Sequence, residues 1–433
     1  MNLKEQYADR FISMEEAASL IKPGAIVCGS MGIGVPYQLL DAITKGTKEG
    51  FTLYLAMVAN PIKAYIPPYN EKVTVKNWFL GPVERLSMRF KPNLFYQPIH
   101  LSDMSFDRIH NHKPDVIILQ VTGPDENGML SQGVCPLPAD VITDDMLVIA
   151  QINDRVPFVP GEGTMIPADR VDYYTEASAD LYPLKSSTPG EVEEKIAGYI
   201  CERVEDGSCI QLGIGNLGTA VGTFLRDKKH LGIHTEMFVE AMVDLIECGA
   251  VDNSRKKLYP GKTVFGFAAG PQRLYDFMNN RKDLLSRAFA YVNDPRVICQ
   301  NDKVVSINAA MEVDLTGQIC AESIGQRQYS GTGGQYDFVK GAHWSEGGQS
   351  FIAMPSTRTD KEGNLHSKIS LTLPLGATVT TLRSDVQYVV TEFGIADIQN
   401  QPIDERAKRL IAIAHPDFRD ELTMQAKKAG LML

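Results

Sequence analysis

The sequence of 433 residues has no excess of positive charge and no long apolar run. Lys and Arg number 43 against 53 for Asp and Glu, which gives a formal charge of -10. A nucleic-acid partner is therefore not expected, because phosphate binding needs a concentrated basic face. No apolar stretch approaches the roughly 20 residues that span a bilayer, and charges interrupt the N-terminal segment where a secretory signal needs an apolar core. We predict a cytoplasmic protein without a membrane partner.

Signals for disulfides and metal sites are also missing. The seven cysteines are odd in number and include no Cys-X-X-Cys pair, so neither a disulfide framework nor a zinc knuckle is predicted. Reduced, mostly buried thiols are the expectation. His110, Asn111 and His112 spell the letters of a nuclease motif, but no further ligands or basic surface accompany them. We interpret them as a surface loop and predict no metal site.

Helix, strand and glycine signals alternate along the first part of the chain. Ser13 to Glu16 has the pattern of a capping box that begins a helix. A short apolar run at 25–28 predicts a buried strand, which leads into a glycine-rich turn at 29–34. Pro36 can then open a second helix through Ile43. Further strands are predicted at 51–58, 116–121 and 147–152.

A similar passage recurs near the middle of the chain. Another capping-box pattern at 188–191 predicts a helix to about 204, followed by a strand at 208–212. A Gly-Ile-Gly turn at 213–215 and a helix at 219–225 come next. The order of elements matches the first passage, which indicates a weak internal repeat. The remaining pattern predicts strands at 263–268, 288–292, 304–307, 350–354 and 387–391, and helices at 403–414 and 417–429.

This alternation of strands and helices predicts an α/β fold with two similar open sheets, each covered by helices on both faces. The expected domains are residues 1–185 and 186–433, joined where Pro and Ser gather near 180–190. In such sheets ligands bind at the carboxyl ends of the strands. Both Gly-Ile-Gly turns are predicted to lie there.

Two glycine-rich segments of the second half could hold a ligand. Gly213 to Gly218 matches the dinucleotide-binding fingerprint, and Glu236 lies near the distance expected for a ribose-binding acid. The fit is partial, because only 231–233 before Glu236 is predicted as strand, and a helix is predicted from 239. An NAD-dependent oxidoreductase therefore stays open as an alternative. Ser330 to Gly334 is either a flexible loop or a place where backbone N–H groups face a ligand.

Four ordered motifs together resemble the acetyl-CoA hydrolase/transferase family, whose relatives include 4-hydroxybutyrate and acetate CoA-transferases. The resemblance covers nearly the whole chain and is strongest after about residue 190. Among the subgroups, the chain is most similar to itaconate CoA-transferases. The motifs are Gly213-Ile214-Gly215-Asn216, Leu231-Gly232-Ile233-His234-Thr235-Glu236-Met237, Ser330-Gly331-Thr332-Gly333-Gly334-Gln335-Tyr336-Asp337-Phe338 and Val390-Thr391-Glu392-Phe393-Gly394-Ile395-Ala396-Asp397.

The resemblance implies two domains of the CoA-transferase (NagB/RpiA-like) type, with the active site in the cleft between them. It implies that Glu236 is a covalent nucleophile in a ping-pong cycle through a glutamyl-CoA thioester. A free Glu has a pKa of about 4.3, so we expect the side chain to be ionised at neutral pH without a general base. Coenzyme A would be a co-substrate, with no permanently bound cofactor. The expected reaction is transfer of CoA from succinyl-CoA to itaconate, and butyrate, acetate or 4-hydroxybutyrate are alternative acids.

The resemblance also implies a set of binding residues. Ile214 and Gly334 are expected to donate to the oxyanion of each tetrahedral intermediate. Asn308 would orient the substrate, or else make a hydrogen bond at a strand end. Met31 would limit acyl size, or else fill a gap in the core. The residues expected near CoA are Gly213, Ile214, Gly215, Asn216, Leu217, Ser330, Gly331, Gly333 and Gly334, with Arg358 and Lys368 either holding the CoA phosphates or solvated at the surface.

Two further alternatives use the same residues. An acyl-CoA hydrolase would replace the acceptor acid with water, and a non-catalytic CoA sensor would bind the ligand without needing Glu236. Enzymes of this kind often form closed symmetric assemblies, so we expect a homodimer or a higher homo-oligomer.

Overall fold

The computed structural model describes residues 3–186 and 188–433. The chain forms two compact units, of which the first contains Met1–Lys185 and Val264–Val292 and the second contains Ser186–Thr263 and Asn293–Leu433. The two expected domains were contiguous, whereas here 264–292 lies with the first unit. Its contacts explain this: Ala268 N donates to Val134 O at 2.7 Å, and Ser286 pairs in parallel with Gly161.

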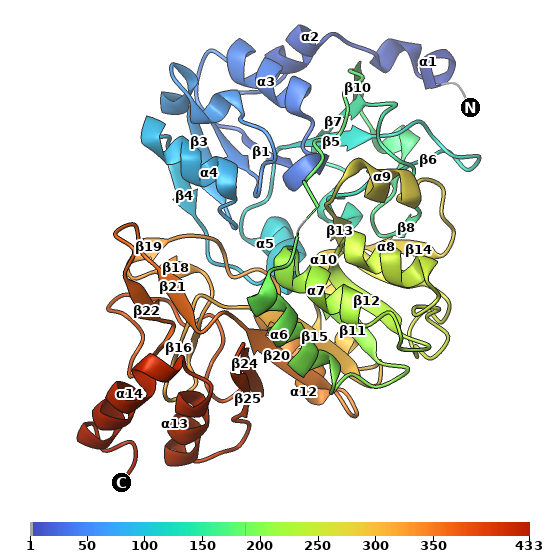
Figure 1. Ribbon diagram of the computed structural model, residues 1–433. Helices are drawn as coiled ribbons and strands as arrows, with labels where there is room; N and C mark the ends of the chain where they lie inside the picture. The colour runs from blue at the N-terminus through green and yellow to red at the C-terminus, as the bar shows by residue number, and fades with distance from the viewer. Residues whose placement is uncertain (1–2, 187) are drawn as a thin grey trace. The chain divides into compact units, whose positions relative to one another are not determined.

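The first unit is built on a parallel sheet of seven strands in the order β10-β7-β5-β1-β2-β3-β4 (Figure 1). Its inner strand β5 is buried at every residue, as expected for a parallel sheet that is covered on both faces. The order reverses beside β1, where β5 lies on one side and β2 on the other. The strands are β1 (Ile26–Gly29), β2 (Phe51–Tyr54), β3 (Val73–Asn77), β4 (Leu94–Tyr96), β5 (Val116–Val121), β7 (Leu147–Ile152) and β10 (Tyr173–Glu176).

Local signals explain the helices of this unit. The capping box at Ser13 is confirmed: its hydroxyl accepts from Glu16 N, and the Glu16 carboxylate accepts from Ser13 N. The helix predicted from Pro36 is also confirmed. Buried apolar residues of α3 pack on the main core of the unit. The helices are α2 (Met14–Ser19), α3 (Tyr37–Gly46), α4 (Pro82–Ser87) and α5 (Met104–His110).

The second unit has a sheet in the order β25-β24-β20-β15-β11-β12, parallel except for the antiparallel pair β24 and β25. Helix α12 packs against β15 and β20, while α6, α7 and α8 pack in a row. The strands are β11 (Cys209–Leu212), β12 (Gly232–Phe238), β15 (Val304–Ala309), β20 (Gln349–Ala353), β24 (Tyr388–Thr391) and β25 (Gly394–Asp397); the helices are α6 (Glu191–Cys201), α7 (Asn216–Phe224), α8 (Glu240–Glu247), α12 (Gln335–Trp344), α13 (Ile403–Ala412) and α14 (Pro416–Lys428).

Two sequence predictions are wrong in detail. The helix predicted from the 188–191 pattern begins at Glu191, and Gly190 is its N-cap, because Gly190 N donates to the Glu193 carboxylate at 3.0 Å. The strand predicted at 288–292 is the short helix α10 (Phe289–Val292), preceded by strand β14 (Leu284–Arg287). A short apolar run has no periodicity that separates the two states.

Five of the seven cysteines are buried thiols, and all seven are free. Among the helices of residues 3–186 and 188–433, none has both the length and the apolar character needed to cross a membrane.

Candidate active site

Glu236 lies within strand β12, beside the strand β11 that ends at the Gly-Ile-Gly turn. The two strands are parallel, with Cys209 opposite Gly232, so Glu236 and the turn both lie toward the carboxyl ends of neighbouring strands. The strand predicted at 231–233 is too short, since β12 continues to Phe238 through residues that alternate in facing direction. The prediction that the strand stops before Glu236 is therefore wrong, and strand length does not count against a dinucleotide site.

The carboxylate of Glu236 has two neutral neighbours. Asn293 Nδ2 donates to Glu236 Oε2 at 2.8 Å, and the main chain of Gly334 lies beside the same carboxyl group and lowers its pKa. Asn293 is fully buried. A Cβ at position 334 would lie 1.8 Å from Glu236 Oε2 and 2.1 Å from Asn293 Nδ2. A larger residue at this position would therefore displace the side chains of Glu236 and Asn293.

Burial changes the acidity of this group. It raises the pKa of Glu236 to about 7, the Asn293 hydrogen bond opposes the rise, and the charge of Asp337 adds to it. Asp337 is itself buried on α12. The expectation of an ordinary pKa near 4.3 is therefore wrong, because it ignored the cost of removing the charge from water. Near neutral pH the side chain exchanges between the acid and the carboxylate.

The turn after β11 has unfilled space beside Gly213 and Gly215. Gly215 has φ +107°, and a Cβ added at Gly213 or Gly215 would meet nothing within 4 Å. A Cβ at Gly218 would lie 2.1 Å from Gly213 O, so that glycine packs the turn against α7. The helix begins at Asn216, three residues earlier than predicted, which places Asn216 and Leu217 in its first turn. Helix N-termini of this kind leave backbone N–H groups available to a ligand.

The loop before α12 is held by its own contacts. Ser330 donates from its amide to Glu322 O at 3.1 Å and from its hydroxyl to Ala321 O at 3.1 Å, so its side chain supports the loop. Gly331 follows it, and Gly333 has φ +58°, a conformation that favours glycine. This bend brings Gly334 to the carboxylate of Glu236.

The sequence did not identify Asn293. It lies in an Asn-Asp-Pro segment, and Asp294 caps the short helix α11 (Pro295–Ile298), so its sequence signal is that of a turn. Asn308, the asparagine chosen from sequence, uses Nδ2 to donate to Ser306 Oγ at 2.9 Å and Gln211 Oε1 at 3.2 Å. This agrees with the alternative of a strand-end hydrogen bond, and Asn308 remains a candidate for substrate orientation only through its other atoms.

The two predicted phosphate-binding cations lie near one acid. Burial raises the pKa of Glu312, and the charges of Arg358 and Lys368 oppose that rise. Arg358 is exposed on β21 (Thr357–Thr359), whereas Lys368 is half-buried and its pKa is lowered by burial. Arg358, Glu312 and His366 line a pocket of about 280 Å³. Neither cation forms an ion pair with a described residue.

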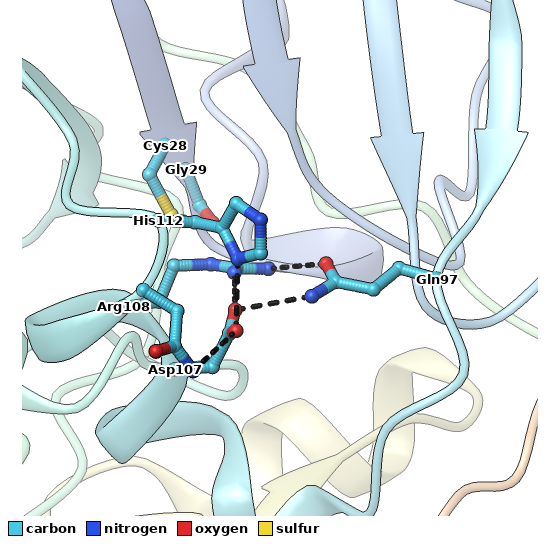
Figure 2. A network of polar contacts seen from close by, with 7 residues as sticks. Cys28, Gly29, Gln97, Asp107, Arg108 and His112 are labelled. Carbon is cyan, nitrogen blue, oxygen red and sulfur yellow. Dashed lines mark hydrogen bonds and ion pairs between the residues drawn. The ribbon is translucent and has the colours of Figure 1, made fainter.

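In the first unit, Met31 is buried in the turn after β1. Of the three residues with the letters of the nuclease motif, His110 is the last residue of helix α5, and His112 belongs to a polar network (Figure 2). There Asp107 lies 2.8 Å from His112 Nδ1 and accepts from Gln97 Nε2 at 3.2 Å, and it pairs with the fully buried Arg108. No group of three or more His, Cys, Asp or Glu in the described chain could hold a metal ion.

Known proteins of one family match this chain along its length. Sequence profiles of the acetyl-CoA hydrolase/transferase N-terminal and C-terminal domains match residues 1–183 and 270–426. Succinyl-CoA:cyclohexane-1-carboxylate CoA transferase of Geobacter metallireducens is 40% identical, with 98% of this chain and 97% of that protein covered. 4-Hydroxybutyrate coenzyme A transferase of Clostridium kluyveri is 37% identical over 99% of this chain and its own full length.

The fold gives the same result. The crystal structure of RipA from Yersinia pestis has a TM-score of 0.92 and 35% sequence identity, with both chains covered completely. 4-Hydroxybutyrate CoA-transferase from Porphyromonas gingivalis has a TM-score of 0.78 at 29% identity. The chain therefore belongs to the acetyl-CoA hydrolase/transferase family and is a CoA-transferase.

Proposed function

We propose that this enzyme transfers CoA from an acyl-CoA to a short-chain or dicarboxylic acid through a glutamyl-CoA thioester on Glu236. The observation that carries the proposal is the setting of the Glu236 carboxylate. Desolvation raises its pKa, its neighbours Asn293 and Gly334 are neutral, and no contact described pairs it with a cation. Such a group has a raised pKa and keeps a reactive electron pair.

The first half of the cycle needs two substitutions at carbon. A carboxylate oxygen of Glu236 attacks the thioester carbonyl, the C–S bond breaks, and CoA leaves as a thiolate, which gives a mixed anhydride. The thiolate attacks the glutamyl carbonyl, the bond to the first acid breaks, and that acid leaves as a carboxylate. The acceptor acid then reverses these steps on the glutamyl-CoA thioester, so no proton, electron or water is consumed.

Amide donors stabilise the oxyanion of each tetrahedral intermediate. Asn293 Nδ2 already donates to the carboxyl group that becomes the glutamyl carbonyl, and the main chain of Gly334 lies beside that group. The open turn at Gly213 to Asn216 supplies further N–H groups, with Ile214 as the second predicted donor. Arg358 and Lys368 would hold phosphates of CoA, and Met31 would limit the acyl group.

Relatives support the class of acids. Proteins of 36 to 40% identity are a succinyl-CoA:cyclohexane-1-carboxylate transferase, a 4-hydroxybutyrate transferase and a butyryl-CoA:acetate transferase. We propose succinyl-CoA as donor and short-chain acids as acceptors, with itaconate included because the motifs of the sequence resemble that subgroup. A homo-oligomer in the cytoplasm is part of the proposal.

Intact mass spectrometry after mixing the protein with succinyl-CoA tests this function. We expect an adduct with the mass of CoA on the wild type and none on Glu236→Gln. The acceptor acid should then discharge the adduct and form its own CoA ester. Rapid release of free CoA without an acceptor would instead indicate a hydrolase, the activity named for an acetyl-CoA hydrolase of Candida albicans that is 25% identical.

A further inference from the structure

In the first unit, two loops lie side by side at the carboxyl ends of neighbouring parallel strands. The glycine turn 29–34 follows β1, and the segment 56–60, here called the β2 loop, follows β2. Gly32 N donates to Ala56 O at 3.0 Å and joins them. Ligands of open α/β sheets bind outside the strand ends where the strand order reverses, and this sheet reverses beside β1.

One hydroxyl group connects both loops. Tyr37, the first residue of α3, donates from Oη to Gly32 O at 2.8 Å. The same oxygen accepts from Ala59 N at 2.6 Å and from Asn60 N at 3.2 Å. These three bonds use the full capacity of a phenol, one donor and two acceptors. Burial raises the pKa of Tyr37, so its hydroxyl keeps the proton that it shares with Gly32 O in the hydrogen bond.

A buried carboxyl group fixes the same loop from α4. Glu84 is fully buried, and its Oε1 accepts from Val58 N at 2.8 Å and from Asn77 Nδ2 at 3.2 Å. Between these contacts Met57 has φ +52°, a left-handed conformation that a residue with a side chain rarely adopts. Met57 N donates to Phe79 O at 3.2 Å. The surrounding contacts therefore impose this bend, and imposed backbone strain of this kind gathers at ligand sites.

From this geometry we infer that Tyr37 and Glu84 are positioning residues for acyl selection. They fix the main chain of the β2 loop against the turn that carries Met31, and the two loops together set the length of acid that the first unit accepts. The inference rests on the proposed function, and it gives a reason for a phenol that bridges two loops and a fully buried acid at the ends of two strands.

The test is the chain-length profile of the full-length enzyme. With succinyl-CoA as donor, kcat/KM is measured for straight-chain acids from acetate to hexanoate. Tyr37→Phe keeps the ring and removes all three loop bonds, so we expect the ratio of kcat/KM between short and long acids to change about tenfold. Tyr174→Phe is the matched control. It is a buried tyrosine whose Oη donates to Ala168 O, away from both loops.

A uniform loss for all acids, or a profile unchanged in Tyr37→Phe, would overturn the inference. If Tyr37→Phe does not fold, two variants of Glu84 provide the same comparison. Glu84→Gln keeps an acceptor for Val58 N and should retain the wild-type profile, whereas Glu84→Met should change it. A wild type that forms no CoA adduct overturns the proposed function and this inference together. A wild type that works, with a profile insensitive to both positions, overturns only the inference.

Discussion

Two carboxyl groups, Glu236 in the second unit and Asp107 in the first, have opposite surroundings. Burial would raise the pKa of Asp107, but the hydrogen bond from His112 and the charge of Arg108 hold it below its usual range. Burial raises the pKa of Glu236 to about 7, and its partners are two amides and a second acid, Asp337. A carboxylate with cationic partners is a stable part of the fold. One with neutral partners remains basic and reactive.

The largest expected effect separates the two acids directly. Glu236→Gln should slow CoA transfer by on the order of 10⁴-fold or more, because no other group can form the thioester. Asp107→Asn, measured in the same transfer assay on folded protein, should keep nearly wild-type kcat. If Asp107→Asn instead abolished transfer and Glu236→Gln did not, the assignment of the two roles would be reversed.

The donors around Glu236 should matter next. Asn293→Ala removes the Nδ2 contact at 2.8 Å, and loss of one oxyanion donor typically slows the reaction by about 10² to 10³-fold. Stopped-flow measurement of CoA-adduct formation gives the rate. Asn308→Ala also removes a side-chain amide, but this amide donates to Gln211 and Ser306 instead of Glu236. Adduct formation should therefore slow much less in this variant. Equal slowing in both variants would contradict a specific role for Asn293.

Removing the charge of Asp107 should affect stability. Asp107→Asn leaves the fully buried Arg108 without its anion, which should cost about 3 kcal/mol of unfolding free energy. Urea unfolding measures this loss. Asp145→Asn removes the acid of an exposed pair with Lys113 at 2.7 Å, and should change stability little. Similar effects of both substitutions would show that the Asp107 network is no more stabilising than a surface pair.

The acidity of Glu236 predicts a pH dependence. Its folded pKa of about 7 exceeds the ordinary 4.5, so between these values the folded protein binds more protons than the unfolded chain. The associated stability is present below about pH 4.5 and is lost as pH rises through about 7. Glu236→Gln has no ionisable group at this position and does not lose this stability. Its Tm relative to wild type should therefore increase from about pH 5 to about pH 8. A constant difference in Tm would contradict a raised pKa.

The smallest expected effect is a shift of the activity profile. Adduct formation needs the carboxylate, so its rate should rise as pH passes about 7. Asp337→Asn removes a nearby negative charge and should move this midpoint toward lower pH. A profile that does not move would show that Asp337 has no electrostatic influence on the nucleophile.

Much of the fold follows from local signals. Strands β5, β7 and β13 (Thr263–Ala268) match the predicted ranges, because buried parallel strands are continuous apolar runs between turn formers. The capping box at Ser13 was equally clear. The position of 264–292 could not be read from sequence, because it depends on pairing with residues far away in the chain, such as Ser286 with Gly161.

The site was predictable only in part. Motifs singled out Glu236 and Gly334, and the structure places these two residues side by side. Asn293 was not found, because its segment resembles an ordinary turn and its contact with Glu236 joins two distant parts of the chain. The raised pKa of Glu236 could not be inferred either, since it depends on burial and on Asp337 across the fold.

Chemical trapping tests the central claim most directly. Wild-type protein mixed with succinyl-CoA is treated with borohydride, which reduces a thioester to an alcohol, and then digested and mapped by mass spectrometry. We predict that the side chain at 236 alone becomes an alcohol, and that Asp107 stays unmodified. Reduction at any other residue, or full transfer activity with position 236 unmodified throughout, would contradict the account.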